Sequence, residues 1–332
     1  LGHADWHGWT PADLVFPFFL FIVGVSVSLA LSKRMGRADN PVSLYAKIFR
    51  RSLILFALGI LLRLLFRFNF EGIRIPGVLQ RIAICYLVSA LIFSKVGTKG
   101  RVAIIFFLLV GYYLVMKLVP VPGYGAGVLD FQGNLCGYID AKLLGGHLYK
   151  SGFDPEGILS TFPAIATVLI GTLTGDWLRS SRKVFQKSVG LFAAGFLMTA
   201  LGLLLHPVFP INKQLWTSTF VLFTAGVALL LLGLCYVLMD GIGVKKWAFP
   251  FLVLGANAIF AYVASTVMVK LLLVIKVPTD QGAVALYPYI YEHLLVPLAG
   301  HLNGSLLFPL LLLSLWVLFM IPLYRKKIFI KI

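Results

Sequence analysis

The sequence predicts an all-α fold, a polytopic bundle of transmembrane helices, from three observations. Of the 332 residues, 60% are hydrophobic and only 12% are charged, whereas a soluble domain carries about 25% charged residues. Apolar stretches recur along the whole chain, each near the ~20 residues that a helix needs to cross a bilayer. Gly, Pro and Trp mark the ends of these stretches. We expect residues 1–332 to form a single transmembrane domain.

The apolar stretches predict nine spans in this chain, in order at residues 12–32, 46–66, 77–94, 101–119, 157–178, 186–205, 215–239, 249–273 and 304–324. The chain starts at Leu1 and shows no signal peptide. We therefore expect that one further N-terminal span precedes it in a longer protein.

Basic residues predict the orientation of the bundle. Of the 29 Lys and Arg residues, 19 follow spans 1, 3, 5 and 7 or lie in the C-terminal tail, the pattern of cytoplasmic loops. Residue 1 is then outside and the C-terminus is cytoplasmic. The same rule accounts for the net charge of +17 without nucleic acid as a partner. All six histidines and nine of the twelve acidic residues fall on the outer side.

Two connections on the predicted outer side are long. Residues 120–156 contain a short amphipathic stretch from Leu135 to Leu144, and residues 274–303 are rich in Tyr. Loops longer than ~15 residues are usually functional or disordered, and their aromatic content favours packed lids over the outer face.

Several kinds of chemistry lack their sequence signals. The three cysteines form neither a disulfide framework nor a metal-binding spacing. His3 and His7 are spaced i, i+4, but the residues between and after them are not typical of a helix, so we expect no metal. Nucleophilic triads, P-loops and Rossmann glycine patterns are absent from the sequence.

His3 and Asp13 are the candidate catalytic residues. Imidazole exchanges protons near neutral pH, and His3 lies just ahead of the first span. Asp13 lies in the first turn of that span, where an ionisable group is by default a functional candidate. The alternatives are that His3 is a solvated interfacial residue and that Asp13 only caps the helix.

Arg81, Gln80 and Asn257 are the candidate cofactor-binding residues. Arg81 and Gln80 enter the third span, where a fixed guanidinium suits a phosphate or carboxylate, although an arginine there can also extend to the outer headgroups. Asn257 lies in the middle of the eighth span and either bonds helices together or lines a pocket.

Four segments resemble one known family. The pattern His-Ala-x-Trp-x-Gly-x-Thr-x-x-Asp-Leu-Val-Phe-Pro over residues 3–17 resembles the signature of the heparan-α-glucosaminide N-acetyltransferase family, including its bacterial membrane acyltransferase members. The pattern Arg-Ile-Pro-Gly-Val-Leu-Gln-Arg over residues 74–81 resembles the second motif of that family. Residues 154–157 and 250–257 also correspond to family segments.

The resemblance implies a membrane enzyme of the bacterial inner membrane. It would transfer an acetyl group from cytoplasmic acetyl-CoA to the amine of an amino sugar of the glucosamine type on the outer side. The family's active-site histidine corresponds to His3, and Asp13 is its candidate partner. Arg81, Gln80 and Asn257 are the candidate contacts for acetyl-CoA. The position of Arg81 in the outer half of its span argues for a role near the acetyl end or in helix pairing, and not at the nucleotide. The expected partners are acetyl-CoA, the amino-sugar acceptor, the lipid bilayer and a second copy in a homodimer.

Two questions stay open at this point. His3 either removes the proton as the amine attacks the thioester or accepts the acetyl group itself as an acyl-imidazole. The alternative function is a transporter of amino sugars related to N-acetylglucosamine, which would need a central polar site and no acetyl-CoA. A purely structural scaffold leaves the outer clustering of the histidines without a cause.

Overall fold

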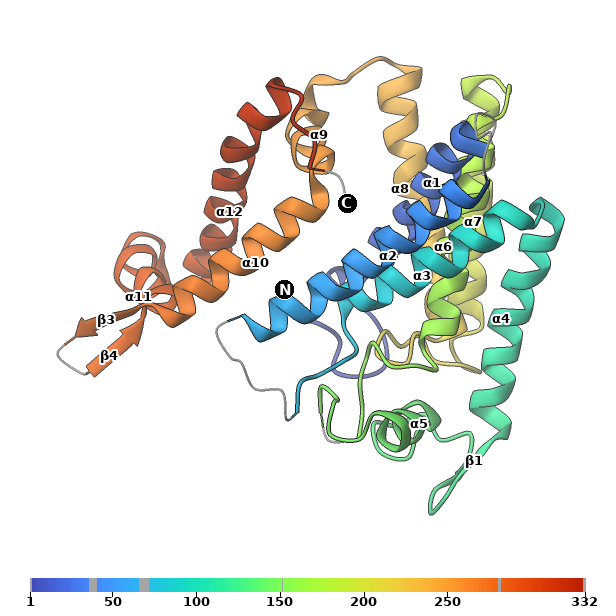
Figure 1. Cartoon of the computed structure of the whole chain (residues 1–332), viewed down its shortest axis with the longest axis horizontal. Coiled ribbons are helices and arrows are strands. Elements are labelled where there is room, and N and C mark those ends of the chain that lie inside the picture. The colour runs from blue at the N-terminus through green and yellow to red at the C-terminus, as the bar shows by residue number, and fades with distance from the viewer. Residues whose placement is uncertain (1, 36–40, 66–71, 151, 280–281, 331–332) are drawn as a thin grey trace. The chain divides into compact units, whose positions relative to one another are not determined.

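The computed structural model describes residues 2–35, 41–65, 72–150, 152–279 and 282–330. Helices dominate it (Figure 1), and the strands among the described residues form two short antiparallel hairpins. The predicted helical class is therefore confirmed, and the candidate membrane spans described below are consistent with a polytopic bundle. The chain divides into two compact units, the first formed by Leu1–Arg63 with Asn69–Gly243 and the second by Leu64–Phe68 with Val244–Ile332.

The first unit carries the candidate catalytic residues. Its elements are η1 (Pro11–Leu14), α1 (Val15–Met35), α2 (Pro41–Leu64), α3 (Val78–Lys95), α4 (Thr98–Leu118), β1 (Pro120–Val121), β2 (Gly125–Ala126), α5 (Leu135–Leu144), α6 (Thr161–Arg179), α7 (Val184–Leu204), α8 (Ser218–Tyr236) and η2 (Val237–Gly241).

The second unit consists of η3 (Lys246–Ala248), α9 (Phe249–Ala256), α10 (Ala258–Val274), β3 (Lys276–Thr279), β4 (Gly282–Ala285), α11 (Leu286–Ile290), η4 (Tyr291–Leu295) and α12 (Val296–Arg325). The helix axis bends by 74° between the segments Lys246–Ala256 and Ala258–Val274. The expected span at residues 249–273 is thus broken at Asn257, whose backbone leaves the helical region (φ −130°, ψ 41°).

The prediction of nine membrane spans is not confirmed. Among the described residues, six helices are long and apolar enough to cross a membrane, or seven if the bent pair α9–α10 counts as one span. A described helix lies in each of the nine expected ranges, but α2 and α6 are not among the candidate spans. Their polar content explains this, since α2 carries four Lys and Arg residues and α6 carries four threonines, Asp176 and Arg179.

The two long connections differ in outcome. Residues 120–156 do form a connection, and α5 coincides with the predicted stretch Leu135–Leu144. Residues 274–303 are not a loop, because helix begins at Leu286 and continues with a kink at Gly300 (φ 73°). Pro288 lies in the first turn of α11, where proline's missing N–H has no partner to lose.

Close contact between α1 and α6 forms the centre of the first unit. A Cβ atom added at Gly171 would lie 2.1 Å from the carbonyl oxygen of Phe21 and 3.0 Å from the Cα of Gly24. A Cβ at Gly24 would lie 1.9 Å from the carbonyl oxygen of Val168. Small residues allow this approach of two backbones, which is how helices associate where lipid removes the hydrophobic driving force.

We predict that Gly171→Ala destabilises the protein by about 1–3 kcal/mol, because the new methyl group forces α1 and α6 apart. Gly111→Ala is the matched control, since a Cβ at this helical glycine of α4 meets no atom within 4 Å. Thermal unfolding in detergent should show a lower Tm for the first variant and an equal or higher Tm for the second. Equal Tm values for Gly171→Ala and wild type would contradict the packing.

Candidate functional site

His3 and Asp13 contact each other directly. The Nδ1 atom of His3 lies 2.7 Å from Oδ1 of Asp13. The Asp13 side chain is 1% exposed, whereas the His3 side chain is 62% exposed. Because Nδ1 faces the carboxylate, Nε2 is the ring nitrogen left for a ligand from solvent. A carboxylate that accepts the Nδ1–H of a histidine fixes the tautomer whose Nε2 carries a lone pair.

Asp13 owes its position to the start of α1. Its Oδ2 accepts hydrogen bonds from the backbone N–H of Thr10 at 2.9 Å and of Ala4 at 3.0 Å. The first of these satisfies a donor at the helix N-terminus. The capping role and the contact with His3, which the sequence left as alternatives for Asp13, therefore coexist in one carboxylate.

The segment before α1 is tied to two distant connections. Trp6 donates its indole N–H to the carbonyl of Leu129 at 2.8 Å, and Gly8 donates its backbone N–H to the carbonyl of Ile211 at 2.8 Å. Gly8 adopts φ 97°, which favours glycine. His3 is thus held between the connection that follows α4 and the one that joins α7 to α8.

Lys213 completes this cluster and was missed by the sequence interpretation. Its Nζ lies 3.1 Å from Oδ1 of Asp13 and 3.1 Å from Nδ1 of His3. The residue lies 210 positions from His3, so no local motif joins them. One signal was present: Lys213 lies on the predicted outer side, where the positive-inside rule leaves a lysine without explanation.

His7 belongs to a neighbouring contact rather than to the His3–Asp13 pair. Its Nδ1 lies 3.3 Å from Nδ2 of Asn212. Burial lowers the pKa of His7, although the charge of Asp130 acts in the opposite direction. Among the described residues, no group of three or more His, Cys, Asp or Glu side chains is arranged to hold a metal.

Arg74 joins two of the segments that resemble family motifs. Its Nε and Nη2 donate to Oδ2 and Oδ1 of Asp154 at 2.6 and 2.5 Å, and Nη2 also donates to Glu156. The guanidinium lies over the ring of Tyr149, 4.7 Å from its centroid. These partners raise the pKa of Arg74 despite its burial. The two-point geometry fixes the segment before α3 against the segment that leads into α6.

Arg81 is buried rather than extended toward headgroups. It is 1% exposed. Its Nη2 donates to the hydroxyl of Ser160 and to the carbonyl of Gly157, and the guanidinium lies 5.1 Å from the ring centroid of Trp216. Its Nε and Nη1 atoms have no hydrogen-bond partner among the described residues, and neither has Nε2 of Gln80. Buried donors of this kind call for an explanation.

Asp140 lies in the same region and was not singled out in the sequence. Its Oδ1 accepts the backbone N–H of Ile158 at 2.9 Å, while Oδ2 is buried without a partner among the described residues. Oδ2 lies so close to Gly157 that a Cβ there would be 1.8 Å away. Burial raises the pKa of Asp140 to about 6, and the charge of Asp154 adds to the effect.

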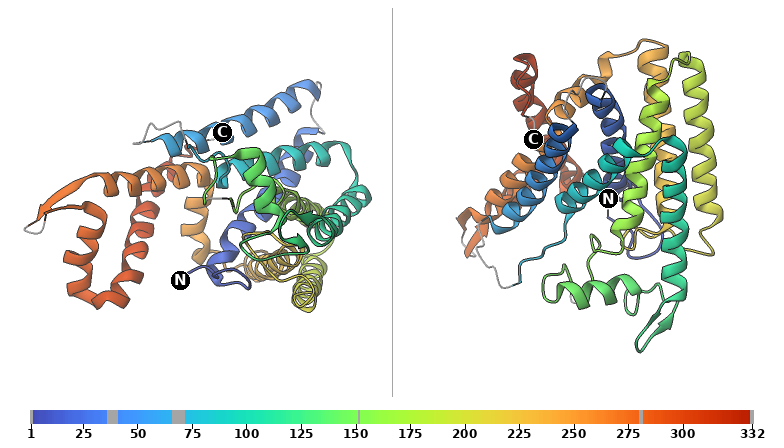
Figure 2. Two further views of the ribbon diagram at one scale, coloured as in Figure 1. Left: turned by 90° about the horizontal axis from the view of Figure 1, so that it is seen from below. Right: turned by 45° about the vertical axis from the view of Figure 1, so that its right-hand side comes forward.

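These residues gather at one end of the first unit. They lie at the starts of α1, α3, α6 and α8 or in the connection after α4, and Figure 2 shows α5 and the β1–β2 hairpin at that end. A second cluster occupies the opposite helix ends. There Arg101 at the start of α4 pairs at 2.5 Å with Asp176 at the end of α6, and Arg179 also contacts Asp176.

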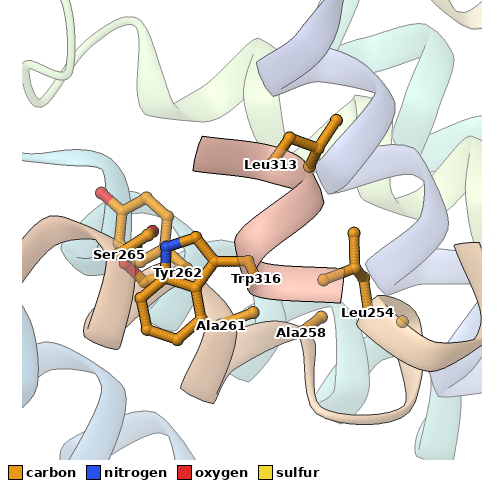
Figure 3. A pocket seen from close by; sticks show the side chains of 8 residues that line it. Leu254, Ala258, Ala261, Tyr262, Ser265, Leu313 and Trp316 are labelled. Carbon is orange, nitrogen blue, oxygen red and sulfur yellow. Dashed lines mark hydrogen bonds between the residues drawn. The ribbon is translucent and has the colours of Figure 1, made fainter. Parts of the chain in front are cut away.

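Asn257 lies in the second unit. Its Nδ2 donates to the carbonyl of Ile328 at 3.0 Å, and its Oδ1 accepts the N–H of Ile330 at 2.7 Å. The amide therefore holds the C-terminal tail at the break between α9 and α10. A pocket of about 350 Å³ lies beside the break, with Tyr262 and Trp316 on its walls (Figure 3) and a lining that is mainly apolar.

Comparison with known proteins finds one matching family model and similar proteins from two organisms. The family model described as heparan-alpha-glucosaminide N-acetyltransferase, catalytic, matches residues 3–202. The chain is 30% identical to the heparan-alpha-glucosaminide N-acetyltransferase of Homo sapiens, with 99% of this chain and 55% of that protein aligned. It is 28% identical to the Mus musculus protein of the same name, with 99% and 56% aligned. The chain thus spans about half the length of these relatives.

We predict that Asp140 makes stability depend on pH. Its folded pKa of about 6 lies above the ordinary 3.8, so the carboxyl group destabilises the folded state increasingly as the pH rises from about 4 through about 6. Asp140→Asn removes the titrating carboxyl group and keeps a side-chain oxygen that can accept the backbone N–H of Ile158. Relative to wild type, the variant should gain about 2 kcal/mol between about pH 4.5 and pH 7.

Thermal unfolding in detergent at several pH values measures this difference. Asp130→Asn is the control, because it makes the same chemical change at an exposed aspartate of the same connection. A Tm difference between Asp140→Asn and wild type that does not change with pH would rule out Asp140 as the titrating group.

Proposed function

The chain belongs to the heparan-alpha-glucosaminide N-acetyltransferase family, and from this premise we propose that it is an acyltransferase that moves acetyl from acetyl-CoA to the amine of an amino sugar. The relatives carry this activity in their names. The contact between His3 and Asp13 is the observation that carries the proposal. It supplies one exposed imidazole nitrogen whose opposite nitrogen is fixed by a carboxylate.

The chemistry needs a base at the acceptor. An amino-sugar amine attacks the thioester carbon, an N–C bond forms and the C–S bond breaks. Nε2 of His3 removes the proton from the attacking amine while Asp13 holds the ring in place, and the proton passes to the departing thiolate of CoA. The same Nε2 also suits attack on the thioester to give an acyl-imidazole that the amine then opens.

We propose that donor and acceptor approach from opposite sides of the membrane. The distribution of Lys and Arg supports a cytoplasmic location for the helix ends near Arg101 and Arg179, and an outer location for His3. Acetyl-CoA would then enter from the cytoplasmic side and present its thioester near the outer end. This topology fits the bacterial inner membrane with a cytoplasmic C-terminus, and a homodimer stays a prediction.

Arg81 and Gln80 are the proposed contacts for the acetyl end of the donor. Their support is the set of buried donor atoms that have no partner among the described residues. The support for Asn257 is weaker, because both of its amide atoms bond to residues 328–330, so contact with acetyl-CoA would require release of that tail. The transporter alternative needs a central polar site, whereas the pocket beside Asn257 is mainly apolar.

We predict that His3→Ala lowers the kcat for acetyl transfer to glucosamine at least ~100-fold, because the base or nucleophile is lost. Asp13→Asn should lower it less, since the ring stays but loses its negative partner. The assay follows acetyl-CoA-dependent acetylation of a panel of amino sugars by the full-length protein in liposomes. His301→Ala is the control, because His301 is exposed and lies in the second unit. Wild-type activity of His3→Ala would remove His3 from the mechanism.

A further inference from the structure

Lys213 contacts both members of the proposed catalytic pair. Its Nζ is 3.1 Å from the carboxylate of Asp13 and 3.1 Å from Nδ1 of His3. The residue lies outside residues 3–202, the range that the family model matches. Its role is therefore an inference from geometry, and it rests on the proposed function of His3.

The proton on Nδ1 decides what Lys213 does. An ammonium group only donates hydrogen bonds, and Asp13 only accepts them when ionised. If Nδ1 carries a proton, it donates to Asp13 at 2.7 Å and Lys213 donates to the same carboxylate. If Lys213 donates to Nδ1 instead, the proton moves to Nε2 and the imidazole loses its lone pair toward solvent. While Lys213 donates to Asp13, it is compatible with the tautomer that Asp13 favours. It opposes that tautomer only if it leaves the carboxylate and donates to Nδ1 of His3.

The charge of Lys213 acts on the imidazolium as well. Beside an isolated carboxylate, a histidine is protonated more readily, because the opposite charge stabilises the cation. Here the same oxygen of Asp13, Oδ1, contacts both Nδ1 of His3 and the ammonium group of Lys213. Among the described residues, Asp13 from η1 and Lys213 are the charged groups that contact the ring, while Asp5 and His7 belong to its own segment. The pair is neutral, so it orients the imidazole without charging it.

The connection between α7 and α8 holds Lys213 in place. The side-chain oxygen of Asn212 accepts the backbone N–H of Leu215 at 2.8 Å, and the backbone N–H of Trp216 donates to the carbonyl of Lys213 at 3.1 Å. Trp216 adopts φ 51°, a strained conformation for a non-glycine residue. Its ring is 1% exposed and lies against Phe16, 5.2 Å between centroids. A surface lysine on a mobile loop would have no such anchor two and three residues away.

We propose that Lys213 is a positioning residue that neutralises Asp13 and thereby keeps His3 unprotonated at the pH where it must accept a proton. A base that is already protonated cannot remove a proton from the amine. The carboxylate alone would orient His3 and also charge it. With Lys213 present, Asp13 still orients the ring of His3 but no longer favours its protonation.

The experiment measures the protonation of His3 without requiring transferase activity. Diethyl pyrocarbonate acylates the unprotonated imidazole nitrogen, and peptide mass spectrometry reports the modification rate at His3 as a function of pH. In Lys213→Met the midpoint of this rate should move to higher pH, because the variant removes a positive charge that lies 3.1 Å from Nδ1 and opposes the imidazolium. Lys213→Arg keeps the charge and should keep the wild-type midpoint.

Transferase assays then connect the titration to function. With one acceptor, the acid side of the kcat/KM profile of Lys213→Met should move in the same direction, while Lys213→Arg restores it. Lys142→Met is the matched control, since Lys142 is an exposed lysine of α5 at the same end of the unit. Lys213→Gln replaces Lys213→Met if that variant does not fold.

The outcomes separate the two proposals. Equal midpoints at His3 for wild type and the neutral Lys213 variants overturn the role of Lys213, whatever the activity. A shifted midpoint in a protein that acetylates no amine supports the role of Lys213 and removes the proposed function. A shift that Lys142→Met reproduces shows a general surface-charge effect and also overturns the proposal.

Discussion

The carboxylate of Asp13 is the interaction on which the candidate site depends. It is 1% exposed and accepts from the backbone of Ala4 and Thr10, from His3 and from Lys213. These donors come from three parts of the chain: the N-terminal segment, the first turn before α1, and the connection between α7 and α8. A buried carboxylate costs free energy unless donors surround it. That requirement brings the three parts together, and the exposed edge of His3 is a consequence of it.

The same requirement organises the second part of the site. Arg74 and Arg81 lie at the two ends of the segment 74–81. Arg74 donates to Asp154 and Glu156. Arg81 donates to Gly157 and Ser160, which follow them just before α6. Removal of either member of a buried charge pair leaves the other uncompensated. The two segments therefore form one structural unit, which fixes the start of α3 against the start of α6 and sets the depth at which Arg81 enters the bundle.

The sequence predicted what local pattern determines. The amphipathic stretch of α5 and the helical content of the apolar ranges follow from composition and spacing. The pairing of His3 with Asp13 followed from one local motif, in which the two residues are ten positions apart. The sequence did not predict Lys213 or Trp216, because their contacts join residues far apart in sequence. The break at Asn257 was missed for a related reason: the tail at residues 328–330 satisfies the amide where the helix stops, and hydropathy carries no information about such a partner.

Charge at this end of the first unit is nearly balanced, and the balance bears on reactivity. Asp13 with Lys213 is neutral, Arg81 faces the charge of Asp140, and Arg74 faces two carboxylates. The net charge of +17 of the chain therefore has its origin elsewhere. Nε2 of His3 is therefore presented to solvent beside a pair of groups whose charges cancel, because Nδ1 and Lys213 both contact the same oxygen of Asp13. What the pair supplies to the reaction is the orientation of the ring toward the amine and the departing thiolate.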